Sequence, residues 1–210
     1  MADWVTISSL ATAAGTTMLA LATFAAVRSA NRAARIAENA FLTGQRPLVM
    51  PSRLDDPSEK LMWGDQHFAH VEGGRGSVEL VDGNIYLAMS LRNAGRGTAV
   101  LQGWRADRYN TDVDRSPSPS EAFRPQLRDL YIGSGDIGFW QAAIRDEADP
   151  DYDWLRRCIT DRSVFLIELI YSDAEGGQRA VGLFTLAPGR ENAWLCSVVR
   201  HWNLDRPNPR

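Results

Sequence analysis

Hydrophobic and polar positions divide the chain into two parts with different periodicities. Residues 4–27 contain no charged residue, and helix-favouring residues continue from there to Leu42. Beyond Pro47 the pattern changes to short segments in which apolar and polar residues alternate, separated by turns rich in glycine and aspartate. The pattern therefore predicts one long N-terminal helix followed by a β-rich domain.

The uncharged segment has the length of a transmembrane helix. At about 1.5 Å per residue it would extend roughly 36 Å, which exceeds the ~30 Å of a bilayer's hydrocarbon core. Alanine and threonine dominate the segment, so it is only weakly apolar. A cleavable signal peptide is one alternative, but it needs a positively charged start, and this chain begins with Met1, Ala2 and Asp3. A buried globular helix is the other. We predict a transmembrane helix over residues 1–27.

The flanking charges predict how this helix is oriented. No arginine or lysine precedes it, whereas Arg28, Arg32 and Arg35 follow directly. Positively charged flanks remain on the cytoplasmic side of a membrane. The N-terminus should therefore lie outside the cell and the remainder in the cytoplasm. The three arginines would then lie at the level of anionic lipid head groups.

The helix is expected to continue beyond the membrane as a juxtamembrane helix over residues 28–45, with Gly44 and Pro47 as its stop signal. Small and apolar residues recur at seven-residue spacing on one face, which allows a second helix to approach closely. We predict homo-oligomerisation through this face, with docking on the chain's own β-rich domain as the alternative. The predicted oligomer seam comprises Thr16, Ala20, Thr23, Val27, Ala30, Ala34, Ala37 and Phe41.

Residues 46–210 are expected to form an antiparallel β-sandwich or a small barrel, which makes the chain mainly β. Asp82–Gly83 between two apolar runs predicts a tight hairpin, and residues 173–177 predict a longer one. One short helix is expected after the acidic stretch 146–153. The expected strands cover residues 48–53, 67–72, 77–81, 84–92, 98–109, 164–172, 178–187 and 194–202.

Two stretches carry a family resemblance. Ile85–Val100, with its turn from Asn93 to Thr98, and Val164–Leu186, with Tyr171-Ser172-Asp173 before a glycine-rich turn, are similar to strands and turns of immunoglobulin-like β-sandwich modules. Such modules occur in bacterial single-pass membrane-anchored proteins of unknown function. The resemblance implies an immunoglobulin-like fold and an adhesive or scaffolding tendency. It transfers no functional residue.

A glycine motif is the strongest candidate for cofactor chemistry. Gly133–Gly138 has the G-x-G-x-x-G spacing that lets a turn and a helix N-terminus approach a pyrophosphate. Dinucleotide binding also requires a βαβ unit with a long helix after the glycines. Only a short segment separates Gly138 from the break at Asp149–Pro150. We therefore expect a loop between strands here.

Other candidate ligands lack the spacing that their chemistry needs. Asp149, Asp151 and Asp153 alternate as in a calcium loop, but the glycine and the final glutamate of that loop are missing, so we expect a solvated acidic loop. His67 and His70 should face opposite sides of a strand. We predict no metal, no cofactor, and reduced thiols at Cys158 and Cys196.

The functional hypothesis follows from an anchor joined to a domain without a recognisable catalytic motif. A net charge of −3 disfavours a dedicated nucleic-acid binder, and two cysteines exclude a disulfide-dense scaffold. We predict a single-pass membrane protein whose cytoplasmic domain is a protein-interaction or scaffolding module with an unidentified protein partner. The alternatives are an enzyme or nucleotide-binding protein with a site near Gly133–Gly138, and an extracytoplasmic adhesive module.

Overall fold

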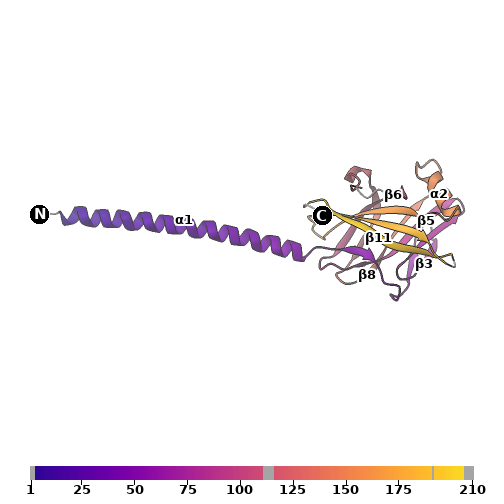
Figure 1. Ribbon diagram of the computed structural model, residues 1–210, viewed down its shortest axis with the longest axis horizontal. Coiled ribbons are helices and arrows are strands. Elements are labelled where there is room, and N and C mark those ends of the chain that lie inside the picture. Colours follow the sequence, from indigo (N-terminus) through magenta and orange to yellow (C-terminus); the bar gives the residue numbers. More distant parts are fainter. Residues whose placement is uncertain (1–2, 111–115, 191, 206–210) are drawn as a thin grey trace. The chain divides into compact units, whose positions relative to one another are not determined.

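The computed structural model describes residues 3–110, 116–190 and 192–205 (Figure 1). Met1 and Ala2 of the expected anchor, and residues 111–115, lie outside the described residues. The chain forms two compact units, residues 1–44 and 45–210. The second is called the β unit below.

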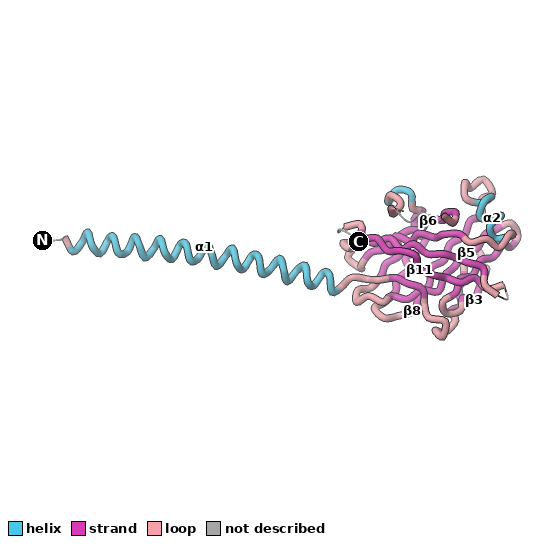
Figure 2. Tube along the Cα trace, viewed as in Figure 1, coloured by secondary structure: helices cyan, strands magenta, loops and turns pink. Residues whose placement is uncertain are grey.

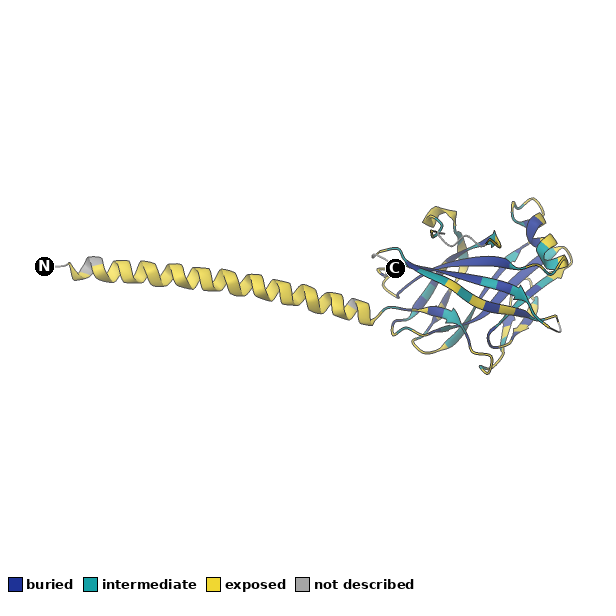
Figure 3. Cartoon of the chain, viewed as in Figure 1, coloured by how far each residue is buried: buried dark blue, intermediate teal, exposed yellow. Residues whose placement is uncertain are grey.

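The first unit is a single uninterrupted helix, α1 (Trp4–Gly44). Threonine hydroxyls along it donate to the carbonyl oxygen four residues earlier, as from Thr16 to Thr12 and from Thr23 to Leu19, both at 2.8 Å. These bonds satisfy the hydroxyl donors within the helix, which matters in a bilayer because lipid chains offer no hydrogen-bond acceptor. The described side chains of α1 are exposed (Figure 3). Its segment Ile7–Phe41, with a mean hydropathy of 1.6, is long and apolar enough to cross a membrane, and the expected long helix is confirmed.

The β unit consists of strands with one short α-helix and one 3₁₀ turn (Figure 2). The helix, α2 (Tyr152–Thr160), lies where the sequence predicted it. The strands are β1 (Val49–Pro51), β2 (Glu59–Met62), β3 (Phe68–Val71), β4 (Arg75–Val81), β5 (Asn84–Asn93), β6 (Ala99–Arg108), β7 (Arg124–Ile132), β8 (Ile137–Ile144), β9 (Phe165–Ser172), β10 (Ala180–Pro188) and β11 (Trp194–Asn203), and the 3₁₀ turn is η1 (Ser120–Ala122).

Nine strands form one antiparallel sheet in the order β1-β5-β4-β11-β10-β9-β6-β7, and β8 also pairs with β5. β1 and β4 pair with different residues of β5, so they share one edge of β5 and β8 occupies the other. The ends of the sheet are therefore β7 and β8, which a short turn connects. The sheet curls into a half-barrel around one core. An antiparallel, mainly β domain is confirmed, whereas two packed immunoglobulin-like sheets are not.

The core fills the inside of this curled sheet. Its side chains come from strands around the whole sheet and from α2, and they include Trp104, Trp140 and Phe165. β9 is buried on both faces because its alternate residues Leu166 and Ile170 belong to a second cluster on the other face of the sheet. All six tryptophans of the β unit are buried.

The hairpin β2–β3 covers part of the outer face. Its apolar residues Leu61, Trp63 and Val71 pack against Tyr86 and Ala88 of β5. The hairpin forms a separate two-stranded sheet. It therefore builds a wall beside the outer face of β5 and its neighbour β8.

Each of the eight expected strands overlaps an observed strand, but β2, β7 and β8 were not predicted. The two expected hairpins are confirmed, and Asp82 and Gly83 have φ angles of 49° and 78° as their tight turn requires. Gly133–Gly138 lies where β7 ends and β8 begins. Because a strand and not a helix follows these glycines, the βαβ context for dinucleotide binding is absent there.

Asn93 holds together the end of the half-barrel where β7 and β8 meet. Its side chain is fully buried. Its Oδ1 accepts from the amides of Leu48 (3.0 Å) and Gly95 (2.9 Å), and its Nδ2 donates to the carbonyls of Gly97 (2.6 Å) and Ile132 (3.0 Å). Its backbone also bonds with Gly135 and Asp136 in the turn between β7 and β8. One side chain thus connects the start of β1, the turn after β5 and the end of β7.

Two glycines after Asn93 let the chain's entry segment lie against this turn. A Cβ atom at Gly95 would lie 2.2 Å from the Arg46 carbonyl oxygen, and one at Gly97 would lie 1.8 Å from that of Gln45. Any side chain at either position would push the two backbones apart. The close approach explains the glycines of the 93–98 turn without any binding role.

Asn93→Ala is expected to lower the free energy of unfolding of the β unit by roughly 3–5 kcal/mol, because it leaves several buried backbone groups without partners. Urea unfolding of the full chain in detergent, followed by tryptophan fluorescence, measures this. The exposed Asn110→Ala is the control and should change stability by less than about 0.5 kcal/mol. Equal stability of the two variants would contradict the role given to Asn93.

Candidate functional site

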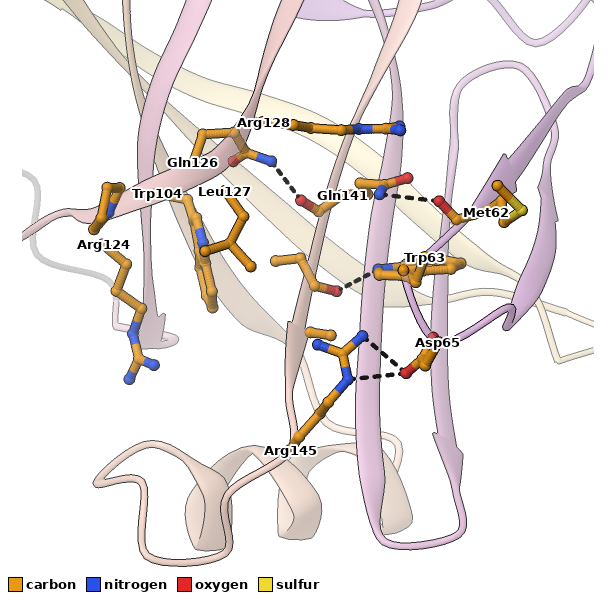
Figure 4. Close-up of a pocket in the computed structure, with 14 residues that line it drawn as sticks. Met62, Trp63, Asp65, Trp104, Arg124, Gln126, Leu127, Arg128, Gln141 and Arg145 are labelled. Atoms are coloured by element: carbon orange, nitrogen blue, oxygen red, sulfur yellow. Dashed lines mark hydrogen bonds and ion pairs between the residues drawn. The ribbon is translucent and has the colours of Figure 1, made fainter.

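The candidate site is an open pocket of about 810 Å³ between β7, β8 and the loop that joins β2 to β3 (Figure 4). It lies where the two ends of the sheet face each other without strand pairing. Its volume falls within the ~300–1,000 Å³ usual for ligand sites. Its lining residues are Met62, Trp63, Gly64, Asp65, Trp104, Arg124, Pro125, Gln126, Leu127, Arg128, Gln141, Ala142, Ala143 and Arg145.

A wide bulge in β7 shapes the mouth of the pocket. The pairing of β7 with β6 jumps from Leu130 opposite Leu101 to Pro125 opposite Gly103. Residues 126–129 therefore have no partner in the β6 register, and such bulges redirect side chains locally. Leu127 is 91% exposed within this bulge, although it is a large apolar side chain.

Buried aromatic and small side chains contribute the apolar part of the lining. Trp104 is 5% exposed, and its ring makes an edge contact with Trp140 at 5.5 Å between centroids. Trp63 is 4% exposed, and its indole Nε1 donates to the carbonyl of Ala142 at 3.0 Å. That bond fixes the hairpin to β8. The pocket therefore has buried aromatic walls, and a hydrogen bond from Trp63 holds the wall on its hairpin side.

Two glutamine side chains connect the walls of the pocket, Gln126 from β7 to β8 and Gln141 from β8 to the hairpin. Gln126 Nε2 donates to the backbone carbonyl of Gln141 at 2.9 Å, and Gln141 Nε2 donates to the carbonyl of Met62 at 3.3 Å. Because a carbonyl acceptor faces each amide nitrogen, the orientation of both side-chain amides is defined. Their Oε1 atoms are buried and have no donor among the described residues. Gln141 is only 8% exposed, so an unused acceptor there is costly.

A charged triad closes the hairpin side of the pocket. Arg145 Nε and the Tyr86 hydroxyl both donate to Asp65 Oδ2, at 2.8 and 2.6 Å. These hydrogen bonds, that of Arg145 first, hold the pKa of Asp65 well below its usual range. Burial, followed by the hydrogen bond to Asp65, raises the pKa of Tyr86. At neutral pH Asp65 is therefore an ionised partner of Arg145 and Tyr86.

The acidic stretch 146–153 holds a second arginine. Arg124 donates to both carboxyl oxygens of Asp149 and to Asp151, with 2.6 Å between Nη2 and Asp151 Oδ2. The hydrogen bond from Arg124 lowers the pKa of Asp149. The Arg124 guanidinium also lies 5.2 Å from the centroid of the Trp104 ring. The expectation of a merely solvated acidic loop is therefore wrong for Asp149 and Asp151.

Arg128 differs from the other two arginines of the pocket. It is exposed, and its guanidinium lies 5.6 Å from the centroid of the Phe139 ring. Among the described residues no carboxylate pairs with it. It is thus the one cation of the lining, within the described part of the chain, whose charge no carboxylate offsets.

The lining of the pocket combines apolar side chains with a few polar groups that are held by hydrogen bonds. The described residues that line the pocket include no serine, threonine, cysteine, histidine or lysine, and the single carboxylate, Asp65, is committed to Arg145 and Tyr86. Nor does any group of three or more His, Cys, Asp or Glu side chains in residues 3–110, 116–190 and 192–205 have a geometry that could hold a metal ion. An apolar cavity with a few fixed polar groups is typical of recognition sites.

The residues predicted from the sequence lie elsewhere. Arg28, Arg32 and Arg35 and the whole predicted oligomer seam are on α1, where they are exposed. Helix–helix contact through this seam stays a prediction. His67 pairs with Glu79 at 2.9 Å and stacks on Tyr86, and His70 is exposed and takes no part in that pair. Cys196 is buried and Cys158 half-buried, both as free thiols.

No protein-family model matches the chain, and no curated protein matches it significantly. The immunoglobulin-like resemblance therefore has no support from relatives. The pocket and its chemistry carry the functional argument.

Asp65→Asn is expected to lower the melting temperature of the β unit by about 2–5 °C at pH 7, because it breaks the charged bonds to Arg145 and Tyr86. The folded pKa lies below the unfolded value of ~3.9, so the stabilisation is complete above that pH and declines as the pH falls below it. The difference between wild type and variant should therefore be largest at pH 7 and smaller at pH 3, where the unfolded carboxyl is mostly protonated while the folded one is still ionised. A difference that is undiminished at pH 3, or one matched by the exposed Asp55→Asn, would contradict this.

Proposed function

We propose that the chain is a single-pass membrane-anchored protein whose β unit is a protein-interaction module, with the β7–β8 pocket as its binding site. The observation that carries the proposal is an open pocket with apolar walls, fixed polar groups and no reactive side chain among its described lining residues. A recognition site attached to a helix long enough to cross a membrane fits a tethered binding protein better than an enzyme.

The anchoring part of the proposal rests on α1. Its uncharged segment precedes Arg28, and its threonine hydroxyls bond within the helix. By the charge rule the N-terminus lies outside and the β unit lies in the cytoplasm. Arg28, Arg32 and Arg35 then contact lipid head groups, and the seam from Thr16 to Phe41 brings a second copy of α1 alongside. A homo-oligomer would present two or more pockets on one membrane patch. An immunoglobulin-like origin of the β unit remains a prediction from the resemblance alone.

The chain is expected to stay with membranes after washing in alkaline carbonate, because α1 is embedded in the bilayer. Leu19→Arg combined with Leu21→Arg places two charges at the centre of the span and should release a large fraction of the protein. Ile36→Arg, beyond the predicted span, is the matched control and should behave as wild type. Release of the intact wild-type chain would refute the anchor.

A fluorescent protein fused to the C-terminus should fold and fluoresce, whereas a C-terminal alkaline phosphatase should be inactive, because the β unit faces the cytoplasm. Changing Arg28, Arg32 and Arg35 together to glutamate should reduce the fluorescence and raise the phosphatase activity. An active phosphatase on the wild-type chain would instead support the extracytoplasmic adhesive module.

The photo-crosslinker p-benzoylphenylalanine at position 127, at the mouth of the pocket, is expected to trap a discrete protein partner in intact cells. The same group at position 54 is the control, because Leu54 is 74% exposed and does not line the pocket. A position-127 variant that yields no product beyond that of position 54 would contradict a protein-binding pocket.

A further inference from the structure

Two strand edges are left without a partner at the pocket. β8 pairs only with β5, and β7 pairs only with β6, so the edges that face each other carry no strand in the described part of the chain. Residues 126–129 of β7 lack a partner in the β6 register as well. Unpaired backbone N–H and C=O groups on an edge are a template for an additional strand.

The two edges are protected to different degrees. On β8, the carbonyls of Gln141 and Ala142 accept hydrogen bonds from Gln126 Nε2 and Trp63 Nε1. No side chain in the described part of the chain covers the bulge of β7 in this way, and Leu127 projects from it with 91% exposure. Met62, opposite in the hairpin, is 50% exposed. Exposed apolar side chains beside unpaired backbone groups are uncommon on strand edges, because they promote pairing with another chain. Their presence here indicates that another polypeptide covers this edge.

Hydrogen-bonding groups of the lining also await a partner. Gln126 Oε1 and Gln141 Oε1 are acceptors that receive no hydrogen bond from the residues that the structure describes, and Gln141 is more than nine-tenths buried. Figure 4 shows Gln126 reaching from β7 to β8 and Gln141 reaching from β8 toward Met62 of the hairpin, with Arg128 also on the β7 side. Arg124 and Arg145 already hold carboxylates, whereas Arg128 does not. The unused groups are therefore acceptors in the gap and one cation at its rim.

We propose that the pocket binds an extended polypeptide segment of a partner protein, which adds a strand along the bulge of β7, places an apolar side chain against Trp104 and Ala143, and presents an acidic residue to Arg128. This inference rests on the proposed function and specifies its ligand. A peptide supplies alternating N–H and C=O groups for the unpaired edge as well as apolar and acidic side chains. A small amphipathic anion would satisfy only the apolar walls and Arg128.

The test uses the full chain in lipid nanodiscs and a phage-displayed library of random linear dodecapeptides. We expect enrichment of peptides that alternate apolar and acidic residues. For the best peptide, Leu127→Glu should weaken binding at least tenfold, because it removes an apolar contact and repels the acidic residue, whereas the exposed control Leu54→Glu should change it less than twofold. Arg128→Gln should weaken binding about three- to tenfold and reduce its salt dependence.

A copy of the same peptide that is methylated at alternate backbone nitrogens distinguishes strand addition from binding through side chains alone. The copy keeps every side chain but loses the backbone N–H donors that strand pairing needs, so it should bind at least tenfold more weakly. Equal binding of the methylated copy, binding unaffected by Leu127→Glu, or no enriched peptide would overturn the inference. Displacement of the peptide by decanoate, with the methylated copy binding unchanged, would identify an amphipathic-anion site instead. A protein trapped at position 127 together with any of these results would leave the proposed function intact and reject only the strand mode.

Discussion

The architecture depends on the hydrogen bonds of one buried amide, Asn93. The two ends of the curled sheet, β7 and β8, meet at the turn that joins them, and the backbone groups buried at that junction need hydrogen-bond partners. Asn93 supplies them to Leu48, Gly97 and Ile132 with a single side chain. Gly95 and Gly97 allow the entry segment to come close enough for these bonds. The junction is thereby fixed without strand pairing between β7 and β8.

The pocket is a consequence of this arrangement. β7 and β8 are held together at the Ile132–Ile137 end, but the bulge at residues 126–129 prevents pairing further along. Two ion-paired arginines then stabilise the sides of the gap, Arg124 through the acidic loop and Arg145 through Asp65. Since carboxylates already pair with both arginines, these two side chains line the pocket without an unpaired charge. The recognition chemistry that is left consists of Leu127, Arg128 and the two glutamine oxygens.

The sequence predicted those strands and turns that a short, continuous run of residues specifies by itself. β5 and β9 are continuous apolar runs, and the turn at Asp82–Gly83 has a defined backbone requirement. β7 was missed because Pro125 and the charged residues around the bulge obscure any alternation. β8 was missed because its first residues, Ile137 and Gly138, belong to the glycine motif for which a loop was expected.

The site could not be predicted for a related reason. It is assembled from β7, β8 and the β2–β3 hairpin, and the hairpin is far from the two strands in the sequence, so its place beside them depends on long-range contacts. The acidic stretch 146–153 seemed solvated because its partner, Arg124, precedes it by 25 residues. The loop between strands expected at the G-x-G-x-x-G motif is confirmed as the turn between β7 and β8, since glycines serve such a turn as readily as a phosphate loop.

Hydrogen–deuterium exchange of the full chain in nanodiscs tests the open gap between β7 and β8 most directly. If the account is correct, the amides of residues 127–129 exchange within seconds, while those amides of Leu130–Ile132 and of β9 that are hydrogen-bonded to neighbouring strands remain protected for far longer. Uniform protection along the whole of β7 would show that the strand is fully paired, and there would then be no open edge for a partner to occupy.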